Sequence, residues 1–434
     1  MTRATDEPLT DVQAATVDPD YPVDPVPHHA RKSWFSLAVV LVGFTMFTPT
    51  MLAGAQVGAA YSFLPLMGVL LLGSLVLGIY VSALGWLGAS TNLTTAMMAR
   101  ATFGRAGAKM SSLLLGGTQV GWYGVSVATL ALLTGQALGW ESDAAVRWLM
   151  LGSGLLMGIT AYIGYRGMYV LSLVALPLML ILGAWVAWKA FAEVGGVGEM
   201  LAIKPESTMG LAMAVTLIVG TFASGGTQAP NWTRFARTPA AGFWTCIAAF
   251  LGAQMLMLFS GAIGALAFGE GDFVVVLLNL GLVVWGLLFL VANIWTTNDN
   301  TAYNVGVAGA ELFNSRRRKP FVIAGVVLGT LLAVTGIYDS LITYLVWLGI
   351  LIPPLGGVIL GDHLARRDEW GSTTSLVPDG VRWDNIAVYA VGCAAAWASN
   401  EAAFFIPPVV GALVALLGAV LVRSLRRRPA PQQG

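Results

Sequence analysis

The chain alternates long apolar stretches with short polar breaks from residue 34 almost to its end. A bilayer core is crossed by about 20 apolar residues of helix. Reading the stretches against this length predicts twelve transmembrane helices, near 34–54, 62–86, 107–137, 146–165, 168–192, 208–228, 240–268, 280–312, 320–338, 341–363, 384–402 and 406–423. The eighth range is long enough to add an interfacial segment that begins at Asp272.

Composition supports this interpretation. Of the 434 residues, 57% are hydrophobic and only 10% are charged, whereas a soluble domain usually carries about 25% charged residues. So few charges cannot cover a water-soluble surface of this size, which excludes a soluble enzyme and a disordered protein. The sequence therefore predicts an all-α polytopic membrane protein.

The Lys and Arg residues predict an orientation, because cytoplasmic loops are enriched in them. With the N-terminus in the cytoplasm, 20 of the 23 lie on the inner side and only Arg147, Lys189 and Lys204 lie outside. Residues 1–30 carry six acids against one base and five prolines. This composition predicts a disordered acidic cytoplasmic tail, and residues 426–434 form a second cytoplasmic tail.

Two predicted spans contain helix-breaking residues at mid-depth. Span one reads Gly43-Phe44-Thr45-Met46-Phe47-Thr48-Pro49, and span six reads Gly220-Thr221-Phe222-Ala223-Ser224-Gly225-Gly226-Thr227. Proline obstructs the preceding helical turn and paired glycines are weak helix formers, so we predict unwinding at Pro49 and at Gly225-Gly226. Unwound backbone in a membrane is tolerated where protein buries it or where it lines a cavity.

Spans three and eight carry clustered polar residues, over 116–123 and 293–300. Gly43 and Gly220 are 177 residues apart, and Gln119 and Asn293 are 174 apart. The two members of each pair are five spans apart. Because five is odd, the second member enters the membrane from the opposite side to the first. We predict a five-plus-five inverted repeat with discontinuous helices 1 and 6. Residues 31–205 hold spans 1–5, residues 206–365 hold spans 6–10, and residues 366–425 hold the last two spans.

One face of span eight is polar, with four residues at helical spacing: Asn293, Thr296, Thr297 and Asn300. Such a face could be an interhelical hydrogen-bond seam. Its density of polar atoms and its pairing with a broken helix instead favour oxygen ligands for a small cation. Carbonyl groups freed around Gly43 and Phe47 could lie opposite the two threonine hydroxyls.

Span three places Gln119, Trp122 and Ser126 on one side of its helix, and span six offers Phe222 and Ser224 at its break. Two aromatic rings, an amide and a hydroxyl suit a flat, neutral, polar ring. Tryptophan is also a common lipid anchor, and Trp122 stands out because Gln119 is nearby. The absence of Lys, Arg and His from mid-membrane depth argues against an anionic substrate.

These motifs resemble nucleobase–cation symporter family 1, the purine/cytosine permeases. The resemblance extends over about residues 28–425 and rests on four segments: Gly116-Gly117-Thr118-Gln119-Val120-Gly121-Trp122, Asn293-Ile294-Trp295-Thr296-Thr297-Asn298-Asp299-Asn300, Ala30-Arg31-Lys32 and Ile352-Pro353-Pro354-Leu355-Gly356-Gly357-Val358. It implies a LeuT-like transporter of the inner (plasma) membrane that imports cytosine with a cation, sodium in close relatives. It implies no other cofactor, no nucleic acid and no obligate protein partner.

The resemblance also implies roles for individual residues. In the substrate site, Trp122 and Phe222 would sandwich the base, with Gln119, Ser224 and Asn293 at its edge. In the sodium site, the backbone oxygens would come from Gly43, Phe47 and Asn293, and the hydroxyls from Thr296 and Thr297.

The chain departs from the family after span six. Many members carry Pro-Asp-aromatic-Ser/Thr-Arg there, whereas this chain reads Pro230-Asn231-Trp232-Thr233-Arg234. Without that acid, Arg234 is predicted to be an ordinary inside-positive anchor. Asp299 is the carboxylate within the polar cluster of span eight, and we favour a structural role for it over proton transport.

Three alternatives to a sodium-coupled cytosine importer remain. The nearest is the same fold carrying a purine, a hydantoin or a hydroxymethylpyrimidine with a proton. A channel would need a continuous polar pore, and the sequence offers one polar cluster flanked by apolar helix. An enzyme is disfavoured, because the three histidines, His28, His29 and His363, form no nucleophile–base or metal-ligand pattern.

Overall fold

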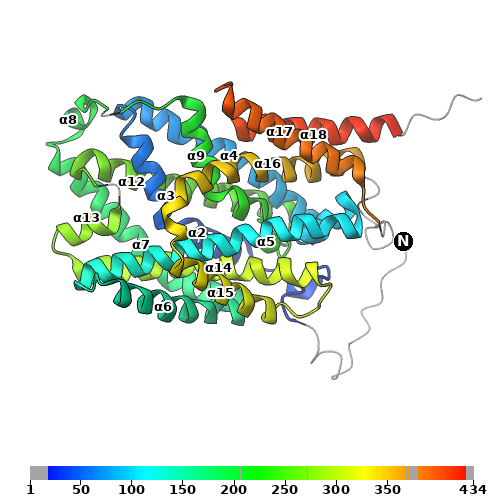
Figure 1. The fold of residues 1–434 in the computed structure, drawn as a ribbon, viewed down its shortest axis with the longest axis horizontal. Helices are drawn as coiled ribbons and strands as arrows, with labels where there is room; N and C mark the ends of the chain where they lie inside the picture. Colours follow the sequence, from blue (N-terminus) through cyan, green and yellow to red (C-terminus); the bar gives the residue numbers. More distant parts are fainter. Residues whose placement is uncertain (1–17, 206, 271, 368–369, 371–379, 427–434) are drawn as a thin grey trace, which may run out of the picture.

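The computed structural model describes residues 18–205, 207–270, 272–367, 370 and 380–426, and its long elements in this part of the chain are helices (Figure 1). A helix or a broken helix lies over each of the twelve predicted ranges. These are α2 (Trp34–Thr45) with α3 (Thr48–Gly58), α4 (Phe63–Thr91), α5 (Thr95–Leu138), α6 (Asp143–Ile163), α7 (Tyr165–Glu193), α9 (Leu211–Thr227), α11 (Pro239–Cys246) with η2 (Ile247–Ala253) and α12 (Gln254–Phe268), α14 (Val283–Leu312), α15 (Lys319–Val334), α16 (Leu341–Ala365), α17 (Trp383–Glu401) and α18 (Pro407–Arg426).

Five short helices complete the described chain: η1 (His28–Ala30), α8 (Val197–Ala202), α10 (Pro230–Thr233), α13 (Phe273–Asn279) and η3 (Ile337–Ser340). Asp272 caps α13, so the additional segment predicted to begin there is confirmed. Among the described residues, seven helices are long and apolar enough to cross a membrane, or eight if the bent pair α2 and α3 is one span. The all-helical membrane fold is therefore confirmed, while the count of twelve crossings stays a prediction.

The helices pack into two main groups. In the first, α4 packs against α9 and α11, and α3 packs against α12. In the second, α5 packs against α14 and α15, and α6 packs against α15. α16 packs against α9 and α18, and α17 and α18 lie along one edge of the molecule, opposite α6 and α15 (Figure 1). The polar helix α14 therefore lies inside the molecule, where its amides and hydroxyls find protein partners instead of lipid.

The N-terminal region differs from its predicted state. A disordered tail was predicted over residues 1–30, but residues 18–30 pack against the helices, and only residues 1–17 of that tail lie outside the described residues. Asp18 and Asp20 are buried and both pair with Arg318, at 3.3 and 3.0 Å. Composition counts acidic residues but not their partners, so it could not anticipate that two of these acids are neutralised by a distant arginine. The second tail, over residues 427–434, also lies outside the described residues.

Arg234 is also placed differently from its predicted position at the membrane surface. Its side chain is fully buried and donates to the carbonyl oxygens of Asn231 (3.0 Å), Asp20 (2.6 Å) and Tyr21 (2.5 Å), and to the hydroxyl of Tyr303 (3.2 Å). The guanidinium group of Arg234 thus has four protein acceptors and holds the N-terminal residues against α10 and α14. The prediction that Arg234 is a simple surface anchor is therefore wrong.

Candidate substrate and cation site

The first span is broken, as predicted. α2 and α3 are bent by 58° at the break, where Met46 and Phe47 have extended backbone. Pro49 lies in the first turn of α3, a position that tolerates proline because its missing N–H needs no helical partner. The chain therefore unwinds just before the proline and not at it.

The sixth span is interrupted at a different residue from the predicted one. Within α9 the non-helical backbone is at Phe222 (φ −132°, ψ 15°), whereas Gly225 and Gly226 remain in the helix. A Cβ atom on Gly225 would lie 2.6 Å from Cζ of Phe44, and one on Gly226 would lie 2.4 Å from Cγ2 of Val81. These glycines allow close packing of helices, so the prediction that they unwind the helix is wrong.

Asn293 of α14 fills the break in the first span. Its side-chain Oδ1 accepts hydrogen bonds from the backbone N–H of Thr48 (2.6 Å) and from the Thr48 hydroxyl (2.8 Å). The Thr48 N–H is the usual helical partner of the carbonyl of Phe44, so that carbonyl is free of the helical ladder. The amide of Asn293 thus holds the break open and faces the broken helix.

Three carbonyl oxygens surround the hydroxyl of Thr297. Its Oγ1 lies 3.0 Å from the oxygen of Phe44, 3.2 Å from that of Asn293 and 3.4 Å from that of Met46. Neutral oxygens gathered in this way suit a hard monovalent cation. Thr296, by contrast, donates to carbonyls of its own helix, at Ala292 and Asn293. Gly43 lies in the last turn of α2, packed against Ser172 of α7.

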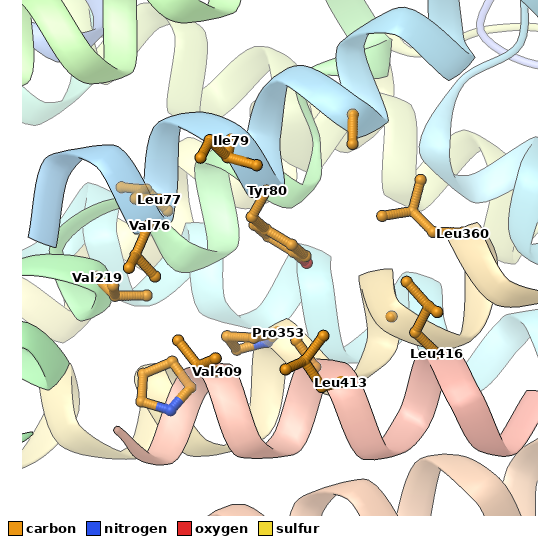
Figure 2. Close-up of a pocket in the computed structure, with 14 residues that line it drawn as sticks. Val76, Leu77, Ile79, Tyr80, Val219, Pro353, Leu360, Val409, Leu413 and Leu416 are labelled. Atoms are coloured by element: carbon orange, nitrogen blue, oxygen red, sulfur yellow. The ribbon is translucent and has the colours of Figure 1, made fainter. Parts of the chain in front are cut away.

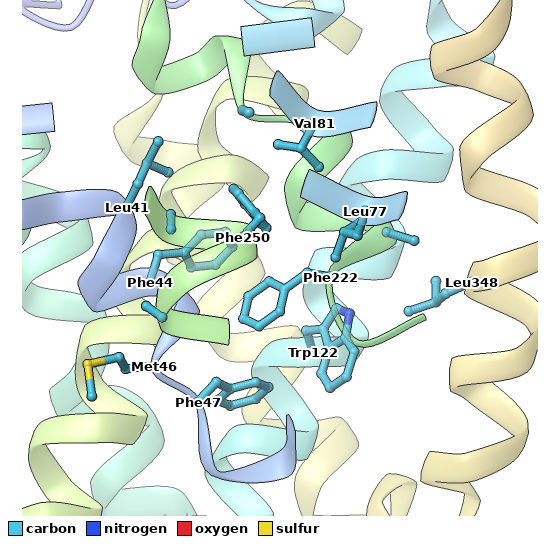
Figure 3. Close-up of a cluster of buried hydrophobic side chains, with 14 of the residues drawn as sticks. Leu41, Phe44, Met46, Phe47, Leu77, Val81, Trp122, Phe222, Phe250 and Leu348 are labelled. Carbon is cyan, nitrogen blue, oxygen red and sulfur yellow. The ribbon is translucent and has the colours of Figure 1, made fainter. Parts of the chain in front are cut away.

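The aromatic side chains of Phe47, Trp122 and Phe222 lie close together (Figure 3) and line a small buried cavity. The ring of Phe47 packs edge-on against Trp122 and against Phe222, with ring centres 5.5 and 6.1 Å apart. Trp122 also packs against Tyr344 of α16. The cavity has a volume of about 10 Å³, room for about one water molecule. Binding of a planar base therefore requires the rings of Phe47, Trp122 and Phe222 to separate.

The polar edge of this cavity comes from α5 and α9. The side-chain amide of Gln119 donates to the hydroxyl of Ser224 (3.0 Å), which also pairs with the hydroxyl of Thr118 (2.5 Å). Gln119 is buried, and among the described residues no group donates to its Oε1 atom. The cavity wall thus carries a free acceptor beside two hydroxyls.

The structure brings most of the predicted residues together. Gln119, Trp122, Phe222, Phe47 and Thr297 line one cavity, and Ser224 contacts it through Gln119. The side chain of Asn293 is directed to Thr48 instead. Five residues with contacts in this region were not assigned a role from the sequence: Phe44, Thr118, Thr221, Thr301 and Tyr344. Thr301 could have been found, because it is one turn beyond Thr297 on the same face, whereas Tyr344 is a single aromatic in an apolar helix and gives no signal.

A larger groove between α4, α16 and α18 is a different kind of site (Figure 2). It measures about 330 Å³ and is lined by aliphatic side chains, of which Ile79 and Leu413 are at least half exposed. Its polar group, the hydroxyl of Tyr80, already pairs with the hydroxyl of Thr227 at 2.6 Å. Among the described residues, this groove therefore offers no unpaired polar group that could orient a polar substrate.

Comparisons with known proteins agree with this architecture. The sequence profile of permeases for cytosine and purines, uracil, thiamine and allantoin matches residues 25–421. Cytosine permease of Escherichia coli strain K12 is 38% identical over 380 residues, which cover 87% of this chain and 89% of that protein. Allantoin permease of Bacillus subtilis strain 168 is 23% identical and covers 89% of this chain, with 85% of its own length matched.

Solved structures share the fold. Mhp1, a nucleobase-cation-symport-1 family transporter in a closed conformation with bromovinylhydantoin bound, matches with a TM-score of 0.79 and 19% identity, over 94% of this chain and 95% of Mhp1. A Na⁺-coupled sialic acid symporter matches with a TM-score of 0.63 and 13% identity, over 96% of this chain and 94% of the symporter. The chain therefore shares its fold with these membrane transporters, and its small cavity lies beside the breaks in the first and sixth spans. From the profile match and the identity over most of its length, the chain belongs to the family of permeases for cytosine and purines, uracil, thiamine and allantoin.

Proposed function

We propose that this permease imports cytosine by symport with sodium, through alternating access. The observation that carries the proposal is the cavity itself, in which the Gln119–Ser224 edge and the ring of Trp122 lie beside the oxygen-rich surroundings of Thr297. A neutral aminopyrimidine offers donors and acceptors at its edge and an aromatic face. The 38% identity to a cytosine permease supports cytosine as the base.

In this proposal, Trp122 and Phe222 stack on the base, and Gln119, Ser224 and Asn293 bind its edge. Sodium is held by the backbone oxygens of Gly43, Phe47 and Asn293 and by the hydroxyls of Thr296 and Thr297. The carbonyl of Phe44 is a further candidate, because it contacts Thr297 directly. Neutral oxygens favour sodium over a proton, since none of these groups accepts a proton near neutral pH.

The proposal includes a topology. Both termini are cytoplasmic, in an inner (plasma) membrane, as the asymmetry of Lys and Arg indicates. Residues 31–205 and 206–365 are two inverted repeats, with 366–425 outside them. The breaks in α2–α3 and in α9 occupy corresponding places in the two repeats, and rocking of one group of helices against the other would expose the cavity to each side in turn.

Uptake of radiolabelled cytosine into proteoliposomes, with and without an inward sodium gradient, tests this function. We expect accumulation that depends on sodium and is competed by unlabelled cytosine. Uptake that follows a proton gradient and ignores sodium would contradict the coupling and favour the proton-driven alternative. Competition by a purine, a hydantoin or a hydroxymethylpyrimidine, but not by cytosine, would contradict the substrate.

A further inference from the structure

The N-terminal strap, residues Asp18–Val26, lies beside the end of α10 and the start of α15. Its backbone carbonyls at Asp20 and Tyr21 accept hydrogen bonds from Arg234, which follows α10. Its carboxylates at Asp18 and Asp20 pair with Arg318, which precedes α15. One short segment therefore holds two arginines from different helices.

These two arginines belong to the two helix groups described above. α10 packs against α4, in the first group, whereas α15 packs against α5 and α6, in the second. Arg318 also donates to the carbonyl oxygen of Ala161 in α6 and lies over the ring of Tyr303 in α14. The strap thus joins two sets of helices that have to move apart if this end of the cavity is to open.

The strap is attached by buried groups. Arg234 and Arg318 are fully buried, and Asp18 and Asp20 are each 7% exposed. The Oδ2 atom of Asp20, which pairs with Arg318, also accepts a hydrogen bond from the backbone N–H of Tyr165, at the start of α7. Removing one partner of a buried ion pair strongly destabilises the folded state, because the other partner is left charged and unpaired inside the protein.

Asn231 lies close to Arg234 but carries no negative charge. Its side chain accepts from the backbone N–H of Thr95 and donates to Asn304 of α14, so it links the groups without any charge. Position 231 therefore offers no carboxylate to Arg234. The strap supplies two of the four acceptors of that arginine and the negative charges that pair with Arg318.

We propose that the N-terminal strap is a gate that closes this end of the transport path, and that it leaves Arg234 and Arg318 when the path opens. This gate rests on the proposed alternating access and on the cytoplasmic placement of the N-terminus. It does not depend on the identity of the base or of the cation. Its release opens a path from this end of the molecule to the cavity, where Thr301 of α14 is part of the wall.

Alkylation of a cysteine at Thr301 tests the gate. In a background of Cys246→Ala and Cys393→Ala, Thr301→Cys is labelled with a membrane-impermeant maleimide in inside-out vesicles, without base or sodium. We expect Asp18→Asn/Asp20→Asn to raise the labelling rate on the order of tenfold, because the amides keep the side-chain shape and remove both charges. Each single substitution should give an intermediate rate.

Asp24→Asn is the matched control. Asp24 belongs to the same strap, but its pair with Arg316 is long (3.6 Å) and exposed, so its loss should leave the labelling rate unchanged. Equal labelling of the double variant and the parent would overturn the gate, and so would an equal rise in Asp24→Asn. A rise that accompanies loss of the cooperative melting transition would also count against it. The labelling is measured without substrate. If cytosine uptake fails, the labelling result therefore still tests the gate independently of the proposed substrate.

Discussion

The hydroxyl of Thr297 lies 3.0 Å from the carbonyl oxygen of Phe44, although 253 residues separate them in the chain. The contact exists because the N–H of Thr48, the usual partner of that carbonyl, donates to Asn293 instead. Two residues of α14, one turn apart, therefore divide the polar groups of the broken helix between them. Asn293 accepts from the N–H of Thr48, and Thr297 donates to the carbonyl of Phe44. Together they place an oxygen-rich pocket at the break.

Thr297→Ala should lower the apparent affinity for sodium. Removing one hydroxyl ligand costs about 1–2 kcal/mol, so we expect a roughly 5- to 30-fold higher sodium concentration for half-maximal uptake. Cytosine affinity at saturating sodium should change much less, because the hydroxyl is hydrogen-bonded to backbone carbonyl oxygens. Sodium titrations of cytosine uptake in proteoliposomes measure both.

Thr216→Ala is a control for Thr297→Ala. Thr216 is also a buried helical threonine, and its hydroxyl donates to a carbonyl of its own helix, Ala212. Its loss should leave the sodium dependence unchanged. An unaltered sodium dependence in Thr297→Ala, with normal uptake, would remove Thr297 from the cation site.

Trp122→Ala should weaken cytosine binding. Loss of an aromatic stacking partner costs on the order of 1–3 kcal/mol per base. Calorimetric titration of purified protein at saturating sodium gives the change. Trp148→Ala, at a position that is 73% exposed, serves as the control, and wild-type affinity in Trp122→Ala would exclude stacking on this ring.

Gly225→Ala should destabilise the protein. The added Cβ would lie 2.6 Å from Cζ of Phe44, and that ring cannot easily yield because it packs on Trp232 with ring centres 5.0 Å apart. Overpacking of this kind costs about 1–3 kcal/mol and should lower the melting temperature in detergent. At Gly183 of α7 an added Cβ meets nothing within 4 Å, so Gly183→Ala should leave the melting temperature equal or higher. Equal stability of both variants would contradict the packing role of Gly225.

The membrane fold could be read from the sequence because it depends on local features. A run of about 20 apolar residues forms a helix in a bilayer whatever its neighbours are, and the proline in the first span marks the break to within three residues. The polar face at Asn293 and Thr297 was also visible, since helical spacing alone places them together.

The features that the sequence did not reveal depend on contacts between distant segments. Gly225 looks like a helix breaker until Phe44 is seen against it, and Arg234 looks like a surface charge until the carbonyls of Asp20 and Tyr21 are seen around it. In the same way, the acidic composition of residues 1–30 predicts a solvated tail unless Arg318 is known to lie beside Asp18. Local propensity describes the isolated segment, and tertiary partners decide these three cases.

Asp272 should make stability depend on pH. It lies between α12 and α14, outside the membrane-spanning helices, and its Oδ1 caps α13 by accepting from the N–H of Val274 (2.8 Å). Burial raises the pKa of Asp272 from 3.8 to about 6, and the nearby charge of Glu270 adds to the rise. A carboxyl whose pKa is raised in the folded state stabilises that state at low pH, and the stability is lost as the pH rises through about 6. The full loss is on the order of 3 kcal/mol.

Asp272→Asn keeps the oxygen that caps α13 and removes the buried charge. We therefore expect a higher melting temperature than wild type at pH 8, and a difference that shrinks as the pH falls to 5, where the wild-type carboxyl is largely neutral. Thermal unfolding in detergent across this pH range measures it. Asp339→Asn, at an exposed acid on the neighbouring η3, should show no such trend. A constant difference between Asp272→Asn and wild type at all pH values would mean that the substitution acts through packing and not through the charge of Asp272.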